Sequence, residues 1–380
     1  MRIAVVVKDF QPERGGVERF AHQFVSQSRA KGHELHVFAN RWDPRGNGDF
    51  LRHTVPALRW PSLAKLISFP LNAHRLLHDS GPFDIVFALT PLFDSDVYRL
   101  GEGIHREVLQ RRYRTRMGRL WKRWGIKSQY LLWMEKRMFS SGHVRQVITI
   151  SEASRRQLLS HYPIPKERVV TIYNGVDLER FNPSVREGFR RSTRTRWGVE
   201  EGEWAVLFVG NDFRRKGLMP LIRAMGLLQK ETIPIKLLVV GRDSPGPFAR
   251  MCHRLGIEER VEFLGPLARV EEAYAGADLF VLPSLYDPFG FSCLEALACG
   301  LPVITSPYAG ASEVIEEGKN GTVVSSLEPP LLAEAIHAIC REGEKWGQSN
   351  QDSWKAAQGF SLDRNTGKIL SLFAEWKEAS

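Results

Sequence analysis

Short runs of aliphatic residues alternate along the chain with longer amphipathic stretches, and this alternation is the main structural signal in the sequence. The first run, Ile3–Val7, leads through a glycine pair into Val17–Lys31, whose apolar residues recur at helical spacing. Gly32 ends this predicted helix, and Leu35–Ala39 is the next predicted strand. A strand, a glycine loop, a helix and a second strand in this order predict a βαβ unit of a parallel sheet.

The alternation continues through both halves of the chain. In the first half, further strands are predicted at Asp84–Ala88, Gln146–Ile150 and Val169–Ile172. In the second half, strands are predicted at Ala205–Val209, Ile235–Val240, Val261–Leu264, Asp278–Leu282, Pro302–Ile304 and Thr322–Val324. Stretches long enough for a helix or a tight loop separate these runs. The predicted fold class is therefore α/β, with two Rossmann-like domains whose parallel sheets bind ligands at the carboxyl ends of their strands.

The domain boundary is predicted where the sequence becomes polar and basic and loses its aliphatic runs, at about residues 176–200. This gives an N-terminal domain at residues 1–178 and a C-terminal domain at residues 179–360. The stretch Leu362–Trp376 is amphipathic, so we expect a C-terminal helix at about residues 361–380 that packs back on the first domain.

Composition adds charge to this picture. The 380 residues are 43% hydrophobic, as in an ordinary globular protein, and carry a formal net charge of +10. A basic surface attracts phosphates, nucleic acid or anionic membrane, and the sign alone does not choose among them. The four cysteines form no Cys-x-x-Cys pair, which argues against a zinc or redox site. Cys293 and Cys299 fit small core residues, so we expect a reduced, cytoplasmic compartment. No run of about 18 apolar residues occurs, so no transmembrane helix is expected.

The most informative stretch is Asp287–Ser306, in which a loop with an acid and a glycine precedes a helix that starts near Phe291. A glycine at a helix start, Gly290, lets a diphosphate approach backbone N–H groups at the positive end of the helix dipole. Glu295 lies about one turn into this helix, where a carboxylate can accept hydrogen bonds from ribose hydroxyls. Asp287 precedes the helix and can bind hydroxyls of a transferred sugar.

This stretch resembles the donor site of the family 4 glycosyltransferases, which have the two-domain GT-B fold with sheets facing across a cleft. The family pattern is Glu-x7-Glu followed by an Ala-x-Gly-x-Pro-Val segment. Glu295 matches the second acid, whereas Asp287 is one methylene shorter than the usual first Glu. The resemblance implies a nucleotide-sugar site to which Phe289, Gly290 and Phe291 also contribute.

Two further segments support the resemblance. Asn211, Arg215 and Lys216 follow a predicted strand. The two cations, Arg215 and Lys216, can neutralise a leaving diphosphate there. The family carries an Arg and a Lys in this place, which implies donor-binding and catalytic roles for these two residues. The resemblance also implies that the pair Gly15 and Gly16 touches the donor across the cleft, although a Gly-Gly pair by itself is more often only a turn.

A candidate catalytic residue comes from a subgroup of the family. Phe10–Arg19, Asn211–Gly217 and Asp96-Val97-Tyr98 resemble motifs of the glucosyltransferases that add the first hexose to the heptose of the lipopolysaccharide inner core. In that subgroup the Asp before Val-Tyr is a catalytic candidate, and Asp96 stands in its place. Asp94 and His105 lie nearby and are alternatives, because many family members offer a His in this loop.

The segment Arg106–Lys127 is strongly basic. It holds nine Lys or Arg residues and one acid, Glu107, interleaved with Trp121 and Trp124. Such a segment suits an anionic membrane interface, so we expect peripheral attachment to the inner face of the cytoplasmic membrane. A solvated helix with aromatic packing is the alternative, and nucleic acid is not an expected partner.

The resemblance therefore implies a retaining, metal-independent hexosyltransferase. It would move a hexose, glucose from UDP-glucose in the first instance, to a glycan or glycolipid acceptor in lipopolysaccharide core or other cell-surface polysaccharide synthesis. The nucleotide-sugar is a co-substrate, and no cofactor is expected. Two alternatives remain open: a nucleotide-sugar epimerase on the same fold, and a non-catalytic binder of membrane or nucleic acid. The sequence does not fix the oligomeric state.

Overall fold

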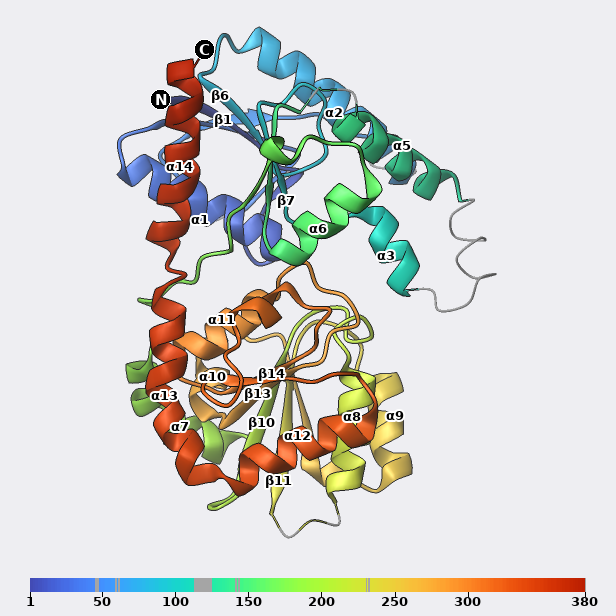
Figure 1. Ribbon diagram of the computed structural model, residues 1–380, viewed down its shortest axis with the longest axis vertical. Helices are drawn as coiled ribbons and strands as arrows, with labels where there is room; N and C mark the ends of the chain where they lie inside the picture. The colour runs from blue at the N-terminus through green and yellow to red at the C-terminus, as the bar shows by residue number, and fades with distance from the viewer. Residues whose placement is uncertain are drawn as a thin grey trace. The chain divides into compact units, whose positions relative to one another are not determined.

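The computed structural model describes residues 1–44, 48–58, 60, 62–112, 125–140, 142, 144–229, 231 and 233–379. The chain divides into two compact units, Met1–Asn174 with Leu362–Ser380, and Gly175–Ser361. Each unit is a parallel β-sheet with helices on both faces, as Figure 1 shows, so the predicted α/β class with two Rossmann-like domains is confirmed. Among the described helices, none is long and apolar enough to cross a membrane.

The first unit contains a sheet with the strand order β5-β3-β1-β6-β7-β8-β9. Its strands are β1 (Arg2–Val6), β3 (Glu34–Ala39), β5 (Leu51–Thr54), β6 (Ile85–Ala88), β7 (Val97–Leu100), β8 (Gln146–Thr149) and β9 (Val169–Thr171). Its helices include α1 (Gly16–Ala30), α2 (Ser62–Asp79), α3 (His105–Arg112), α5 (Ile126–Ser140), α6 (Glu152–His161) and α14 (Leu362–Ala379). Two short strands, β2 (Asp9–Phe10) and β4 (Arg41–Trp42), pair beside this sheet.

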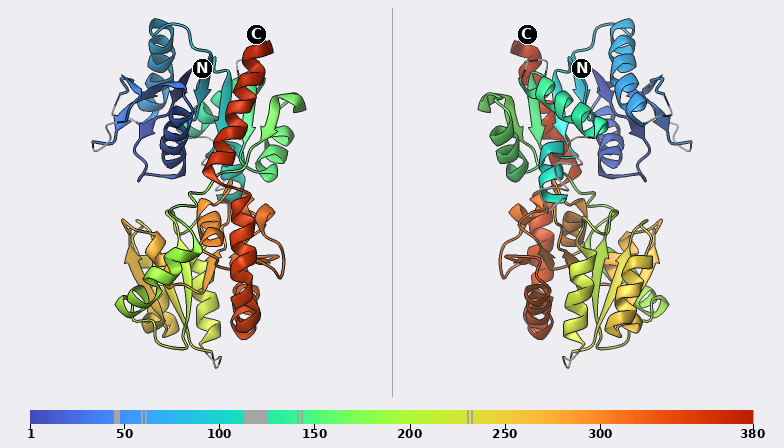
Figure 2. Two further views of the ribbon diagram at one scale, coloured as in Figure 1. Left: turned by 90° about the vertical axis from the view of Figure 1, so that its left-hand side faces the viewer. Right: turned by 90° about the vertical axis from the view of Figure 1, so that its right-hand side faces the viewer.

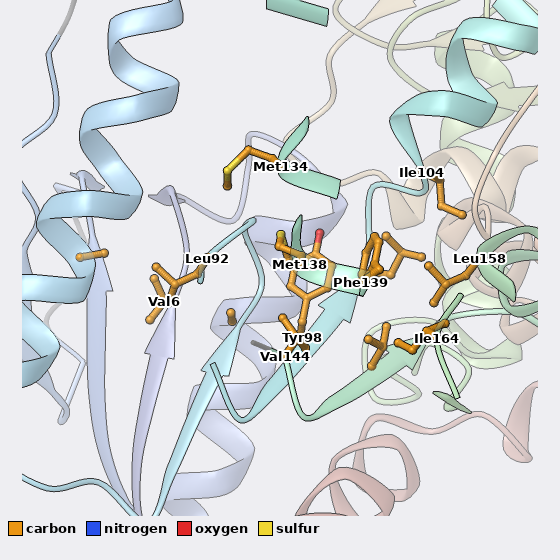
Figure 3. Close-up of a cluster of buried hydrophobic side chains, with 14 of the residues drawn as sticks. Val6, Leu92, Tyr98, Ile104, Met134, Met138, Phe139, Val144, Leu158 and Ile164 are labelled. Atoms are coloured by element: carbon orange, nitrogen blue, oxygen red, sulfur yellow. The ribbon is translucent and has the colours of Figure 1, made fainter. Parts of the chain in front are cut away.

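Different helices cover the two faces of this sheet. The ring of Phe87 in β6 lies 5.0 Å from that of Phe24 in α1 and 5.2 Å from that of Phe373 in α14. Ala88, the next residue, belongs to a buried cluster on the opposite face, because successive strand residues point to opposite sides. Figure 3 shows members of this cluster, including Val6, Leu92, Tyr98, Met134, Met138 and Phe139.

The C-terminal helix α14 packs on the first unit. Its Phe373 also lies 6.1 Å from Phe24 of α1, and Asn365 donates a hydrogen bond of 2.5 Å to the carbonyl of Tyr173. In both views of Figure 2 this helix, drawn in red up to the C-terminus, runs beside the first unit's sheet. The chain thus returns to the first unit after building the second.

The second unit contains a sheet with the strand order β12-β11-β10-β13-β14-β15. Its strands are β10 (Trp204–Val209), β11 (Ile235–Val240), β12 (Val261–Gly265), β13 (Leu279–Leu282), β14 (Val303–Thr305) and β15 (Gly321–Val323). Its helices are α7 (Pro183–Arg196), α8 (Leu218–Leu228), α9 (Gly246–Leu255), α10 (Glu271–Gly276), α11 (Phe291–Ala298), α12 (Pro329–Arg341) and α13 (Gly343–Gln358), within the described residues.

The segment predicted as the interdomain connection, residues 176–200, is largely helix α7 and belongs to the second unit. The helix starts at an Asn182 cap, whose side chain accepts a hydrogen bond from the N–H of Val185. Arginines spaced four residues apart on one face of α7 bind the carboxylate of Asp278, the residue before β13. The basic composition of this segment therefore reflects a docked helix rather than a linker.

In each sheet the chain first adds strands on one side of its first strand and then returns to add the remaining strands on the other side. In the first unit this switch point lies between β1 and β6, and in the second it lies between β10 and β13. Loops that leave the carboxyl ends of such neighbouring strands diverge, and ligands of open α/β sheets bind in the crevice between them.

Candidate functional site

The switch point of the second unit brings two predicted segments together. Lys216, after β10, donates a hydrogen bond from Nζ to Oδ2 of Asp287, which follows β13. Arg215 donates from Nη1 to the carbonyl of Tyr286 at 2.8 Å, and its own carbonyl accepts from the N–H of Leu285 at 2.8 Å. The two loops are thus tied to each other at the carboxyl end of the sheet.

The cationic turn is built around Asp212. This residue adopts a left-handed conformation with φ of 58°, which costs a non-glycine residue energy and is therefore held by its contacts. Its carboxylate accepts from the N–H of Arg215 and from Arg215 Nε, both at 3.3 Å, and its carbonyl accepts from the N–H of Lys216 at 2.9 Å. Asp243 fixes the same turn from the neighbouring loop by accepting from the N–H of Phe213 at 2.7 Å.

Gly217 ends the turn where the two loops touch. Its φ is 83°, and a Cβ atom added there would lie 1.8 Å from the carbonyl oxygen of Pro283. Only glycine therefore fits at this position without moving the end of β13. The close contact holds Arg215 and Lys216 against the loop that carries Asp287.

Asp287 is ionised in spite of its burial. Only 8% of the residue is exposed, and burial by itself raises the pKa of its carboxyl. The charges of Lys216 and Arg215, with hydrogen bonds from Lys216 and the N–H of Phe289, outweigh burial and hold the pKa below its ordinary value. Lys216, which is predicted to bind the phosphates, and Asp287, which is predicted to bind the sugar, therefore form an ion pair with each other.

Helix α11 starts at this site. Gly290 precedes it with φ of 98°, and no side chain caps the first turn. The N–H groups of that turn stand at the positive end of the helix dipole, as an anion requires. Arg215 and Lys216 lie on the adjoining loop, so the region provides cations and backbone donors for a diphosphate.

Glu295 lies further along α11 and is 5% exposed. The hydroxyl of Tyr274 donates a hydrogen bond of 2.7 Å to its Oε2 atom. This contact was not predicted, because nothing in the local sequence pattern singles out Tyr274. Asp212, Asp243 and Tyr286 likewise support the site through contacts that the spacing of motifs does not reveal.

Three other predicted donor residues have mainly structural contacts. Asn211 accepts from the N–H of Arg242 at 3.1 Å through Oδ1 and so joins the loops after β10 and β11. The side chain of Phe289 is buried, and its ring lies 6.4 Å from that of Phe291 at the start of α11. Its backbone N–H donates to Oδ1 of Asp287 at 3.3 Å and its carbonyl accepts from the N–H of Ala311 at 2.6 Å, so Phe289 holds the loop before α11.

Gly15 and Gly16 belong to the first unit, where they begin α1. Oε2 of Glu18 would lie 2.7 Å from a Cβ atom added at Gly15, so this carboxyl sits over the helix start. Burial raises the pKa of Glu18, and Glu102 and Asp9 raise it further. Glu18 lies in the first turn of α1, where an acid complements the helix dipole.

Asp96 lies at the amino end of β7, not at the carboxyl end where ligands bind. Its Oδ2 accepts from the N–H of Val86 at 2.8 Å, and its Oδ1 lies 3.7 Å from Nη1 of Arg145. These contacts join β6, β7 and the start of β8 and favour a structural role. Asp94, two residues earlier, is exposed and lies 3.8 Å from His74.

His105 follows the carboxyl end of β7 and begins α3. The four-residue strand β7, at about 3.3 Å per residue, separates His105 from Asp96. Asp96 therefore lies at the amino ends of the strands and His105 on the side of their carboxyl ends. Burial lowers the pKa of His105, and Lys127 lowers it further, so the ring is neutral at pH 7. Within the described parts of the chain, its Nε2 is buried without a hydrogen-bond partner.

Only the two ends of the basic segment Arg106–Lys127 belong to the described residues, because residues 113–124 lie outside them. Its one acid, Glu107, is buried and accepts from Nε of Arg111 at 2.7 Å. Nε2 of His161 lies 2.9 Å from the other carboxylate oxygen. The acid thus faces the interior, where it neutralises one arginine of the segment.

Two family models match consecutive parts of the chain. The model described as Glycosyltransferase Family 4 matches residues 14–180, and the model described as Glycosyl transferases group 1 matches residues 189–353. The first range lies mostly in the first unit, and the second lies wholly in the second unit, with the loops of the candidate site.

Similar proteins include curated glycosyltransferases. The lipopolysaccharide glucosyltransferase WaaG of Escherichia coli is 25% identical over 331 residues, which cover 86% of each chain. An uncharacterised glycosyltransferase of Methanocaldococcus jannaschii is 33% identical over 210 residues, 53% of this chain and 52% of the relative. The chain thus spans about half the length of that archaeal relative.

Solved structures share the fold. The crystal structure of WaaG matches with a TM-score of 0.86 and 23% identity, over 98% of this chain and 99% of that one. The crystal structure of Anabaena HepE in complex with UDP and glucose matches with a TM-score of 0.74 and 21% identity, over 98% of this chain and 99% of that one.

Proposed function

The chain belongs to the family 4 glycosyltransferases and has their GT-B fold, and from this premise we propose that it is a retaining hexosyltransferase. The proposed donor is UDP-glucose and the proposed acceptor is a glycan or glycolipid of the cell surface. Support for the donor comes from a solved relative whose structure contains UDP and glucose. Support for the acceptor comes from a relative that is a lipopolysaccharide glucosyltransferase.

The observation that carries the proposal is the convergence at the switch point of the second unit. Arg215, Lys216 and the start of α11 lie together there, and Asp287 is bonded to Lys216. A nucleoside diphosphate needs cations and backbone donors for its phosphates, and a sugar needs a carboxylate for its hydroxyls. Glu295, one turn deeper in α11, is the proposed ligand of the ribose.

In the proposed reaction, the acceptor hydroxyl attacks the anomeric carbon on the face from which the diphosphate leaves. The bond from that carbon to the phosphate oxygen breaks, and the acceptor proton passes toward the departing phosphate. Negative charge grows on the diphosphate in this step, so Arg215, Lys216 and the helix start stabilise the transition state more than the ground state. No metal ion is proposed to take part.

For the acceptor side we propose His105 in preference to Asp96. His105 is neutral and follows the carboxyl end of β7. Asp96 lies at the amino end of the same strand, where it accepts a hydrogen bond from the N–H of Val86. A neutral imidazole can accept or donate a hydrogen bond at the attacking hydroxyl. We also propose that Arg106–Lys127 attaches the enzyme to an anionic membrane on the cytoplasmic side, where a lipid-linked acceptor would be presented.

A transfer assay with a panel of labelled nucleotide-sugars tests the function. Release of the nucleotide and attachment of label to an acceptor, or slow hydrolysis without one, supports a transferase. Conversion of the sugar to an epimer that stays attached to the nucleotide would support a nucleotide-sugar epimerase. Absence of any reaction with every donor would support a non-catalytic binding protein. EDTA should leave the rate unchanged, and loss of activity would indicate a metal-dependent transferase.

A further inference from the structure

Tyr274 and Glu295 form a buried pair in the second unit. The Tyr274 hydroxyl donates to Oε2 of Glu295 at 2.7 Å, with 0% of Tyr274 and 5% of Glu295 exposed. The residues are 21 positions apart, in α10 and α11. A hydrogen bond to an ionised carboxylate is about twice as strong as one between neutral groups. The contact therefore restricts the rotation of the Glu295 carboxylate.

The Tyr274 ring has little freedom to move. Phe181 lies edge-on to it, with ring centroids 5.7 Å apart and an interplanar angle of 86°. Phe280 of β13 lies 5.8 Å away. Edge-to-face aromatic packing of this kind is directional, so the ring position fixes the place of the hydroxyl.

Helix α10, which carries Tyr274, is itself clamped. Glu271 accepts from Arg180 Nη2 at 2.8 Å, and Glu272 accepts from Arg196 Nη1 at 2.8 Å. At its other end, Gly276 lies so close to α7 that an added Cβ would be 2.9 Å from Thr193 Oγ1. The hydroxyl of Tyr274 is consequently a donor with a fixed position relative to α11.

We propose that Tyr274 is a positioning residue for nucleotide recognition: it holds the Glu295 carboxylate in the orientation that accepts the vicinal ribose hydroxyls. An ionised carboxylate has about four acceptor sites, so it can in general accept from a phenol and from two hydroxyls at once. A carboxylate oriented before binding loses less conformational freedom when the ligand arrives. The inference rests on the proposed ribose role of Glu295, and it makes Tyr274 a determinant of preference for ribose over 2′-deoxyribose.

Calorimetry with UDP and 2′-deoxy-UDP tests this pairing. Tyr274→Phe keeps the ring and removes only the hydroxyl, so it should weaken UDP about tenfold and 2′-deoxy-UDP less than about twofold. The wild-type preference for UDP should therefore shrink. Equal weakening of both nucleotides, or of neither, would overturn the inference, because a residue that only supports the fold would not distinguish them.

A double-mutant cycle separates this inference from the proposed function. In the Glu295→Ala background, Tyr274→Phe should have no further effect on UDP binding. If Glu295→Ala itself leaves UDP affinity unchanged, the ribose role of Glu295 fails. If Glu295→Ala weakens UDP but Tyr274→Phe does not, only the positioning role fails. Tyr130→Phe, which removes a hydroxyl bonded to the Leu66 carbonyl in the first unit, is the matched control and should change neither affinity.

Discussion

Lys216 donates a hydrogen bond to the carboxylate of Asp287. Lys216 is predicted to bind the diphosphate of the donor and Asp287 to bind its sugar, so the charge of the phosphate-binding cation is already neutralised by the sugar-binding acid. The side chains are 12% and 9% exposed, so water screens this pair little. A bound diphosphate must therefore share Lys216 with Asp287. The pair connects phosphate binding to sugar binding through one contact.

Replacing Asp287 with Asn should separate these two roles. The variant loses the charge that competes for Lys216, so UDP should bind as tightly as to the wild type or more tightly. Transfer should fall by at least about tenfold, because the amide is a weaker ligand for sugar hydroxyls than a carboxylate. Calorimetry with UDP and steady-state turnover with UDP-glucose measure the two effects.

Asp287→Glu is the matched control, since it restores the acid that family 4 normally carries and should keep both properties. Weaker UDP binding by Asp287→Asn would show that the acid supports the phosphate site by holding Lys216 in place. The competition between carboxylate and phosphate would then be the wrong description of the pair.

The same pair predicts a pH dependence of stability. The pKa of Asp287 is lower in the folded protein than its ordinary value, so its contribution to stability is complete above the unfolded pKa of about 3.9 and is lost as pH falls through the folded pKa. The free energy of unfolding of the wild type should exceed that of Asp287→Asn at pH 6, and the difference should shrink below about pH 4. Urea unfolding across this range measures it, and a difference independent of pH would contradict the assignment.

The strands of the second unit could be predicted to within about two residues, because a buried parallel strand is a continuous aliphatic run. The run at β10, for example, is Ala205–Val209 in the prediction and Trp204–Val209 in the structure. β5 was not predicted, since it is an edge strand with mostly exposed residues. β7 was missed because Arg99, 1% exposed, interrupts its apolar pattern.

The candidate site was predictable as a set of segments but not as a set of contacts. Loops that follow β10 and β13 must meet at the carboxyl edge of the sheet, so Arg215 and Asp287 were expected near each other. The hydrogen bond between Lys216 and Asp287 depends on the directions of two side chains whose residues are 71 positions apart in the sequence. Tyr274 gave no signal, because its helix has six residues and all its relevant partners are distant in sequence.

Arg215 and Lys216 should act mainly on the departing diphosphate. Replacing both with Ala should lower kcat more than it raises KM for the donor, because the charge that they stabilise grows in the transition state. Arg214→Ala is the matched control, since Arg214 is exposed in the same turn, and it should keep normal turnover. Near-normal turnover by the double variant would assign this role to another cation.

Asp278 should be important for stability rather than for catalysis. Its carboxylate binds three arginines of α7: Arg186 at 3.3 Å, Arg190 at 2.5 Å and Arg194 at 2.8 Å. It also accepts from the N–H of Ala205 in β10 at 2.9 Å. Asp278→Ala leaves several mostly buried cations without their acid, so it should reduce the free energy of unfolding by about 3–5 kcal/mol.

Asp363→Ala is the control for this measurement, because it removes an ion pair with Lys31 in which Asp363 is 70% exposed. It should cost less than about 1 kcal/mol. Urea unfolding of both variants at pH 7 compares them. Equal small losses would mean that the backbone carbonyls bound by the α7 arginines hold the helix without Asp278.

The basic segment Arg106–Lys127 should bind anionic membrane. Each cation near an anionic surface contributes about 1 kcal/mol, and salt screens the attraction. Changing Arg114, Arg116 and Arg119 to Ser should therefore weaken binding to vesicles with anionic lipid by about 3 kcal/mol, or roughly a hundredfold. Vesicle sedimentation at low and high salt measures the loss of binding. Insertion of Trp121 and Trp124 into the membrane interface should leave a part of the binding that salt does not remove.

A matched variant carries the same change in the second unit, where Arg223, Arg250 and Arg254 are exposed. It loses the same net charge, so it should keep vesicle binding if the segment, rather than the overall charge of +10, is responsible. Transfer to a soluble acceptor should survive in both variants, because the proposed donor ligands lie in other segments. Equally weak binding to vesicles with and without anionic lipid would make the segment an ordinary solvated surface and would favour a soluble sugar as the acceptor.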